Sequence, residues 1–272
     1  MTDFKTYAKL DAINYSTLKH MAKSPLHYRH AVDHPSPDTA GRLKGRGTHT
    51  AVLEPDRFLV DYALFKPEPG KKKAVRKGKR WDDFKAMHAG DSILKLDEYQ
   101  HCLAVAKAVR DHEAASALLA TGKREHSLDW VDEETLLPCK ARLDLLTDDA
   151  IVDLKGVQST DPRKLAFEVA KMGYHGQLAF YREGVRVLTG RNLAAKLICV
   201  EHNAPHDVAV VELDDDGLYA GWEFARKLLH RVAECRATKR WPGRSTETYT
   251  LDLPVWVYPE EDQSLEFEVT NA

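Results

Sequence analysis

Residues 141–156 read ARLDLLTDDAIVDLKG, and this stretch constrains the fold more than any other part of the chain. Most of its side chains are apolar, as in strands that are buried in a sheet. It nevertheless carries Asp144, Asp153 and Lys155. A buried charge is costly unless it is paired or bound to a metal. The stretch therefore predicts a core hairpin that holds a charged site.

The turn TDDA brings these three charges together. Side chains alternate between the faces of a strand, so Asp153 and Lys155 share one face. A hairpin centred near Asp148 places Asp144 roughly opposite Asp153. Converging carboxylates repel unless a cation lies between them, and oxygen ligands of this kind suit Mg²⁺ or Mn²⁺. With an ammonium to orient or deprotonate a water, the arrangement suits metal-assisted hydrolysis of a phosphodiester. The alternative is a partly exposed hairpin with ordinary ion pairs.

The elements around this hairpin predict an α/β fold, a small mixed β-sheet flanked by helices. The strands are expected within residues 57–65, 124–131, 136–146, 150–156, 193–202 and 207–213. The helices are expected within 14–34 (two, broken at Ser24-Pro25), 39–54, 97–120, 162–190 (restarting after Gly173) and 214–238. We interpret residues 1–272 as a single domain. It comprises a helical part (1–120) with a basic loop (71–80), a core (121–240) and an extended C-terminal arm (241–272).

Composition limits the classes of partner. The formal net charge is −2, so any contact with nucleic acid must come from a local patch. The run KKKAVRKGKR at residues 71–80 is such a patch, with seven basic residues in ten, although such runs are often only solvated loops. The four cysteines are scattered, which argues against a structural zinc site or a disulfide framework and fits a cytoplasmic setting. No signal peptide or membrane-spanning run is apparent.

The pattern RLD(x8)DLK, residues 142–155, resembles the core of the PD-(D/E)xK nuclease superfamily. Three further stretches resemble its RecB/RecE-like branch. GRGTHTAVLEP (45–55) is similar to the helix that carries a metal-binding histidine, and GQLAFY (176–181) matches a Q-x-x-x-Y signature. NYSTLKHMAKSPLHY (14–28) resembles the N-terminal segment of RecE-type exonucleases (exonuclease VIII-like). The resemblance runs in order from about residue 10 to about residue 260.

The resemblance implies a role for each matching residue. His49 and Asp144 would hold one Mg²⁺, and Asp144, Asp153 and the Leu154 carbonyl a second, with Mn²⁺ as a substitute. Lys155 would position the attacking water. Gln177 and Tyr181 would lie beside the site, contacting the end of the DNA or bracing the lysine. The remaining assignments are Ser16, Lys19 and Ser24 at a terminal 5′ phosphate, and Lys71, Lys72, Lys73 and Arg76 on the DNA backbone. The helix also carries Glu54, which some relatives use in place of histidine, but the alignment favours His49.

Each assignment has a simpler reading. His49 is compatible with packing, and Gln177 and Tyr181, four residues apart, share a helical face that packing would use equally well. Ser16 and Ser24 are also suitable helix caps.

The resemblance implies a Mg²⁺-dependent exodeoxyribonuclease that digests linear double-stranded DNA from the 5′ end and leaves 3′ overhangs for recombination. Phage or prophage origin, a ring-shaped homo-oligomer and a single-strand annealing protein as partner are implied in the same way. Three alternatives stay open: an endonuclease or a nuclease of other polarity, a non-catalytic DNA-binding subunit, and a small-molecule metallohydrolase. The last is disfavoured because dense His/Asp clusters are missing from the sequence.

Overall fold

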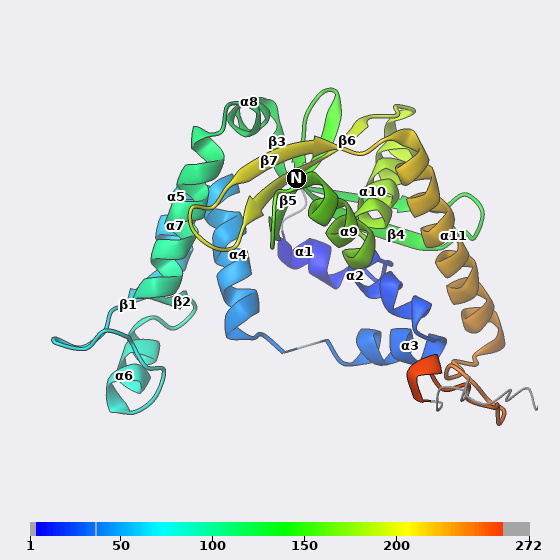
Figure 1. The fold of residues 1–272 in the computed structure, drawn as a ribbon, viewed down its shortest axis with the longest axis horizontal. Coiled ribbons are helices and arrows are strands. Elements are labelled where there is room, and N and C mark those ends of the chain that lie inside the picture. Colours follow the sequence, from blue (N-terminus) through cyan, green and yellow to red (C-terminus); the bar gives the residue numbers. More distant parts are fainter. Residues whose placement is uncertain (1–3, 36, 258–272) are drawn as a thin grey trace, which may run out of the picture.

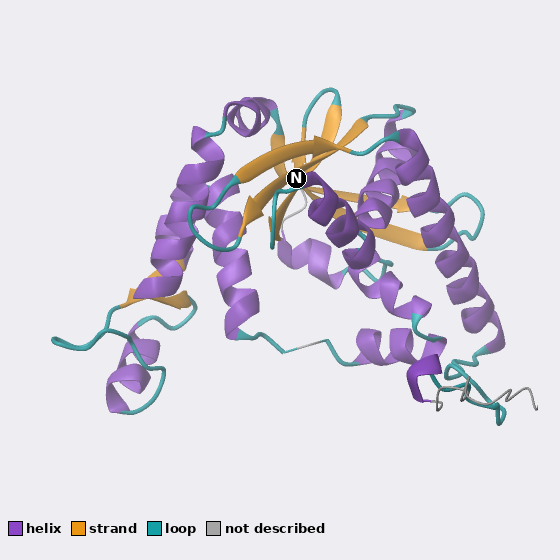
Figure 2. Cartoon of the chain, viewed as in Figure 1, coloured by secondary structure: helices purple, strands orange, loops and turns teal. Residues whose placement is uncertain are grey.

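The computed structural model describes residues 4–35 and 37–257, and its centre is a five-stranded sheet (Figure 1, Figure 2). The strands are β3 (Lys123–Val131), β4 (Pro138–Leu146), β5 (Ala150–Val157), β6 (Ala194–Glu201) and β7 (Val208–Glu212). They lie side by side in chain order. The neighbours β5 and β6 are parallel, and the other pairs are antiparallel. The predicted small mixed sheet is therefore confirmed.

Helices cover both faces of this sheet, which confirms the α/β fold. They are α4 (Ala40–Leu53), α7 (Leu96–Asp111), α9 (Pro162–Met172), α10 (Tyr174–Thr189) and α11 (Asp215–Thr238). One face packs against α4 and α7, and the other against α10 and α11 (Figure 1). The crossover between the parallel strands β5 and β6 consists of α9 and α10, which meet at Gly173 in the left-handed conformation.

Alternate residues of β5 belong to two separate cores. Val152 and Leu154 pack with α4 and α7, whereas Ile151 and Val157 pack with α10 and α11. Each of these four side chains is at most 2% exposed. Burial on both faces explains why the strand is almost continuously apolar. Its charged residues therefore stand in a setting where charge is costly.

Short helices precede α4, as the sequence predicts. They are α1 (Phe4–Lys9), α2 (Tyr15–Leu18), the 3₁₀ helix η1 (Lys19–Ala22) and α3 (Pro25–Asp33). Asn14 caps α2 through its side chain, which accepts a hydrogen bond from the Thr17 N–H at 2.9 Å. Ser24 caps α3 in the same way, accepting from the His27 N–H at 3.2 Å. The predicted break at Ser24-Pro25 is thus a helix cap followed by a proline in the first turn.

The prediction of a strand at residues 57–65 is largely wrong. Pro55–Asp61 form a helix, α5, and only Tyr62–Phe65 form a strand, β1. Proline suits the first turn of a helix, and Pro55, which follows α4 closely, begins α5. The side chains of Leu59 and Val60 are 67% and 76% exposed. They are apolar without being buried, which is why the sequence reads as a strand.

The single helix predicted at residues 97–120 is two helices. The chain turns at His112, between α7 and α8 (Glu113–Thr121). The His112 ring accepts a hydrogen bond from the Ala115 N–H at 3.3 Å and so caps α8. Histidine is an uncommon cap, and the apolar spacing continues across the break.

A small outlying sheet lies beside α4, α5 and α7 (Figure 1). It pairs β1 in parallel with β2 (Ser92–Lys95), and α6 (Lys79–Met87) packs against it. The sequence did not predict β2 or α6. The basic loop joins β1 to α6 and is anchored at two points. Ala74 is buried, and both terminal nitrogens of Arg76 bind the carboxylate of Glu98.

The chain after α11 has no regular structure until a short 3₁₀ helix, η2 (Val255–Val257). Trp241 stacks on Tyr28 of α3 at a ring distance of 5.6 Å, which holds the start of this segment to the N-terminal helices. The rest of the predicted arm, residues 258–272, lies outside the described residues. Within the described ranges, no helix has the length and apolar content needed to cross a membrane.

Candidate active site

Strands β4 and β5 separate at Asp144. Their main-chain pairing ends with Leu145 and Val152, and one step further in this register Asp144 lies opposite Asp153. In place of a main-chain partner, the Leu154 N–H donates a hydrogen bond to Asp144 Oδ2 at 2.7 Å. The carboxylate therefore bridges the two strands where they separate, and it is fixed relative to the charged residues of β5.

Asp153 and Lys155 form an ion pair on one face of β5, as their spacing predicts. Lys155 Nζ contacts Asp153 Oδ2 and also lies 4.9 Å from the centre of the Tyr174 ring. The side chains of Asp153 and Lys155 are only 3% and 16% exposed. Pairing and the aromatic ring offset part of the cost of burying the two charges.

The buried charges shift one another's pKa values. Burial raises the pKa of Asp153 to about 6; the neighbouring charge of Lys155 opposes this rise, and that of Asp144 adds to it. Burial also acts to raise the pKa of Asp144, but His49 and Lys155 outweigh it, and the pKa is lowered. For Lys155, burial acts to lower the pKa, but the two carboxylates raise it overall. Lys155 is therefore held as an ammonium.

His49 reaches this site from α4. Its Nδ1 lies 3.4 Å from Asp144 Oδ2. Burial acts to lower the pKa of His49, but the Asp144 carboxylate outweighs this, and the pKa is raised. Gly47 allows α4 to approach α7 closely, because a Cβ there would lie 3.2 Å from Cys102 Sγ and 3.1 Å from Leu94 Cδ1. This close packing sets the position of the imidazole.

Gln177 and Tyr181 lie on α10 and support the other carboxylate. The Gln177 amide donates to Asp153 Oδ1 at 3.3 Å and to the Tyr181 hydroxyl oxygen at 2.7 Å. The structure thus brings five predicted side chains together with the Leu154 main chain. These side chains are His49, Asp144, Asp153, Lys155 and Gln177, with Tyr181 behind them.

The donor atoms at this site fit a hard divalent cation. Among the described residues, no three His, Cys, Asp or Glu side chains form a ready-made metal cluster. Mg²⁺ is commonly held by one or two carboxylates and completes its shell with water. Asp144, Asp153 and the Leu154 carbonyl offer oxygens of that kind, and His49 offers a nitrogen. Apart from its ion pair, the buried Asp153 Oδ2 has no hydrogen-bond partner among the described residues.

The three residues predicted at a 5′ phosphate lie in three different environments. The Ser16 hydroxyl donates to Asn14 Oδ1 at 2.6 Å, beside the cap of α2. Ser24 is fully buried and hydrogen-bonded to the His27 ring at 2.6 Å, so it serves α3 and does not reach the surface. Lys19 lines a cavity, and the charge of Lys155 contributes to the lowering of its pKa after burial does.

The predicted backbone-binding residues lie on the loop between β1 and α6. Lys71, Lys72 and Lys73 are exposed, whereas Arg76 is half-buried against Glu98. The three lysines are therefore free to reach solvent, whereas Arg76 is held by its ion pair.

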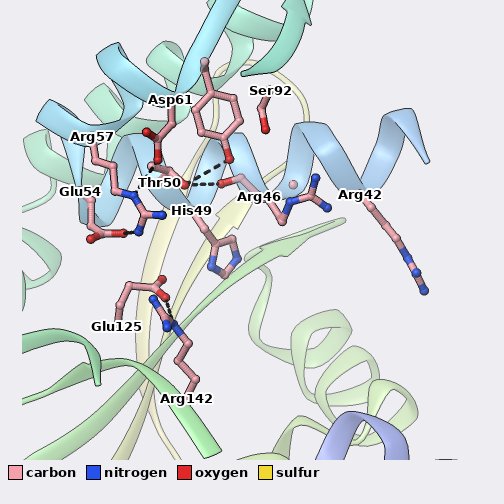
Figure 3. Close-up of a pocket in the computed structure, with 12 residues that line it drawn as sticks. Arg42, Arg46, His49, Thr50, Glu54, Arg57, Asp61, Ser92, Glu125 and Arg142 are labelled. Carbon is pink, nitrogen blue, oxygen red and sulfur yellow. Dashed lines mark hydrogen bonds and ion pairs between the residues drawn. The ribbon is translucent and has the colours of Figure 1, made fainter. Parts of the chain in front are cut away.

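A cavity of about 590 Å³ lies beside His49, between α4, α5 and the sheet (Figure 3). We call it the arginine cavity, because its lining includes four arginines: Arg42, Arg46, Arg57 and Arg142. Its acidic lining residues are Glu54, Asp61 and Glu125. Each carboxylate has a guanidinium partner: Arg57 binds both Glu54 and Asp61, and Arg142 binds Glu125.

Glu125 is a site residue that sequence reasoning missed. In β3 it lies between two residues that pair with Leu145 and Leu143, so it stands opposite Asp144. Its φ is +51°, a left-handed conformation that non-glycine residues rarely adopt and that recurs at functional sites. Burial raises its pKa, and Arg142 opposes this. Its partner Arg142 could have been found, since it lies two residues before Asp144 on the same strand face.

Residues 14–253 match a protein family described as a PDDEXK-like domain of unknown function (DUF3799). The chain belongs to this family. The matched range covers the central sheet, the helices on both of its faces and the three charged residues of the β4–β5 hairpin. The resemblance of the sequence to the PD-(D/E)xK superfamily is therefore confirmed. The assignment to the RecE-type branch of that superfamily stays a prediction.

The fold of the PDDEXK-like domain is shared with a solved structure. This is a candidate exonuclease from Eubacterium rectale, with a TM-score of 0.64 and 15% identity over 94% of this chain and 96% of that chain. An alkaline exonuclease from Laribacter hongkongensis (LHK-Exo), solved with dAMP, is 14% identical over 74% of this chain and 97% of that chain. Its TM-score is 0.28. No curated protein matches the sequence significantly.

Proposed function

We propose that the protein is a divalent-metal-dependent exodeoxyribonuclease of the RecE type. In this proposal it hydrolyses linear double-stranded DNA from the 5′ end and produces 3′ single-stranded overhangs.

The observation that carries the proposal is the separation of β4 and β5. Asp144 and Asp153 lie opposite one another, the Asp144 carboxylate is bound to the Leu154 N–H, and Lys155 is paired with Asp153. An ammonium beside two carboxylates is the arrangement expected where a cation and a water must be held together.

The side chains have distinct roles in this proposal. His49 and Asp144 would hold one ion, and Asp144, Asp153 and the Leu154 carbonyl the other. When bound, the ions supply positive charge that stabilises the attacking and leaving oxygens of an in-line displacement.

The groups around the ions act on the water and on the ligands. The Lys155 ammonium orients the attacking water by hydrogen bonding and gains pre-organisation from its ion pair. Gln177 holds the Asp153 carboxylate from the opposite side, and Tyr181 fixes the Gln177 amide. The strained backbone at Glu125 places the Arg142–Glu125 pair next to Asp144.

The 5′ polarity, the linear duplex substrate, a ring-shaped oligomer and an annealing partner rest on the sequence resemblance. The name of the Eubacterium rectale protein, which shares the fold, agrees with an exonuclease activity. Lys19, whose pKa is lowered by burial and then by the charge of Lys155, adds positive charge beside the site, which suits a polyanionic substrate.

The test is a Mg²⁺-dependent time course on linear duplexes labelled at the 5′ or 3′ end, with closed circular DNA as comparison. We expect early release of 5′-terminal nucleotides, persistence of the 3′ label and no cutting of circles. Cleavage of circles would indicate an endonuclease, and early loss of the 3′ label would indicate the opposite polarity. Binding of DNA without cleavage at any metal concentration tested would contradict the proposed nuclease activity.

A further inference from the structure

A second cavity, of about 500 Å³, lies between η1, the junction of α9 and α10, and α11. We call it the lysine cavity, after Lys19, Lys23 and Lys171 in its lining. His20 and His175 also line it, and within the described part of the chain no Asp or Glu does. The cavity therefore concentrates positive charge in a protein whose net charge is slightly negative.

Among the described residues, none of the three lysines forms an ion pair, in contrast to the lysines at positions 85, 95, 107, 155 and 196. Burial, followed by the charges of Lys155 and Lys23, lowers the pKa of Lys19. Like charges placed together are unfavourable, so an anion in this cavity would relieve their repulsion.

The cavity adjoins the catalytic lysine. Lys171 is in the last turn of α9, and Gly173 ends that helix in the left-handed conformation. The next residue, Tyr174, holds its ring 4.9 Å from Lys155 Nζ. A strand whose phosphates lie in the lysine cavity is therefore close to the proposed site of hydrolysis.

The outer face of α9 continues this basic surface and adds an aromatic ring. Arg163, Phe167 and Lys171 follow one another at four-residue spacing, so they share a helical face. All three are exposed, and the Phe167 side chain is 80% exposed. The inner face of α9, with Leu165 and Val169, is buried, so the helix is stable without burying Phe167. Aromatic rings between cations are the feature that binds unpaired nucleotides.

We propose that Arg163, Phe167, Lys171 and the lysine cavity form a track for single-stranded DNA that leads to Lys155. Phe167 stacks on an unpaired base, and Lys19, Lys23 and Lys171 contact the phosphates on the way to the site. Duplex DNA presents no free base face along its length, so stacking selects the unpaired strand. This inference rests on the proposed nuclease function and adds the form in which the substrate is held.

The test measures binding of fluorescein-labelled oligothymidylate, and of a blunt duplex of equal length, to full-length Asp153→Asn protein. In that background, Phe167→Ala should weaken oligothymidylate binding about tenfold through loss of one base stack and leave duplex binding within about twofold. Phe167→Trp should restore the affinity, because it keeps the ring. The matched control is Leu103→Ala on α7, an apolar residue that is 44% exposed and remote from this track, and it should change neither affinity.

Unchanged oligothymidylate binding by Phe167→Ala would overturn the inference. The same holds if sedimentation shows that Phe167→Ala alters only the oligomeric mass, since the helix face would then be a contact between copies. Cleavage by the wild-type protein is measured in parallel. If the wild-type protein is inactive but Phe167→Ala weakens oligothymidylate binding as expected, only the nuclease function is contradicted. If the wild-type protein is active but Phe167→Ala leaves oligothymidylate binding unchanged, only the track is contradicted.

Discussion

The arginine cavity and the lysine cavity are similar in size, but they differ in how far their positive charges are paired with carboxylates. In the arginine cavity, the acidic lining residues Glu54, Asp61 and Glu125 are all paired, and Arg46 binds Asp38 outside the lining. In the lysine cavity, no carboxylate among the described residues faces the ammoniums. A phosphate that enters the first must compete with existing ion pairs, whereas in the second it meets uncompensated charge. We therefore expect a polyanion to bind in the lysine cavity in preference to the arginine cavity.

The largest effect is expected at the residues between the two cavities. Asp153→Asn or Lys155→Ala should reduce cleavage of linear duplex to background, roughly 10³-fold or more, as for other groups that act together in a site. The measurement is single-turnover cleavage at saturating DNA, with circular dichroism to confirm folding. Near-normal turnover by either variant would show that the chemistry lies elsewhere, for instance in the arginine cavity.

Metal binding should depend on His49 on the arginine-cavity side. Mn²⁺ at about 100 times its Kd should raise the melting temperature of the wild-type protein by roughly 5–10 °C, because it stabilises the native state by about 2.7 kcal/mol. EDTA should reverse the rise, and His49→Ala should reduce it. An equal rise in His49→Ala would remove this residue from the metal site. The readout does not depend on activity.

The basic loop also contains both exposed cations and a cation that is paired with a carboxylate. Lys71, Lys72 and Lys73 are exposed, whereas Arg76 binds Glu98. Changing the three lysines to Ser should flatten the slope of log affinity for duplex DNA against log salt by up to about 2.7 units, at about 0.9 for each of three phosphate contacts.

Arg76→Ser is the matched control for that loop. It should leave the slope nearly unchanged and lower the melting temperature instead. Without Arg76, the Glu98 carboxylate, which is 11% exposed, keeps only the more distant Lys95 ammonium as an ion-pair partner among the described residues. Equal slopes for the triple-lysine variant and the parent would identify the run as a solvated loop.

The smallest effect compares the two cavities directly. Lys19→Ser with Lys23→Ser should flatten the salt slope for single-stranded DNA by about 1.4, at about 0.7 per contact. Arg42→Ser with Arg46→Ser should flatten it by less than about 0.7. Binding is measured with the Asp153→Asn protein across a salt series. A larger effect from the arginine pair would reverse the comparison.

The hairpin that holds the site was predictable because its signals are local. Strand alternation places Asp153 and Lys155 on one face, and the turn TDDA sets the register that brings Asp144 opposite. The junction of α9 and α10 was predictable for the same reason, since a glycine commonly ends a helix, and Gly173 does so in the left-handed conformation.

Other features depend on partners that are distant in sequence. The residue after α4 is a proline that starts a second helix, and the outlying sheet pairs segments about thirty residues apart. The ion pair of Arg76 with Glu98 spans 22 residues, so the basic run appeared uniform in the sequence. Nothing in the sequence around Glu125 signals its positive φ or its place opposite Asp144.

The hydrogen bond from the Leu154 N–H to Asp144 has a consequence for comparing members of this family. Because the carboxylate replaces a main-chain partner, Asp144 contributes to folding as well as to the proposed chemistry. A relative that had lost activity would still be under selection to keep an acceptor there. Persistence of this aspartate is therefore weak evidence that a relative is active. Within the part of the chain that the structure describes, the Lys155 side chain forms no hydrogen bond with the main chain, so its loss would mark an inactive relative more reliably.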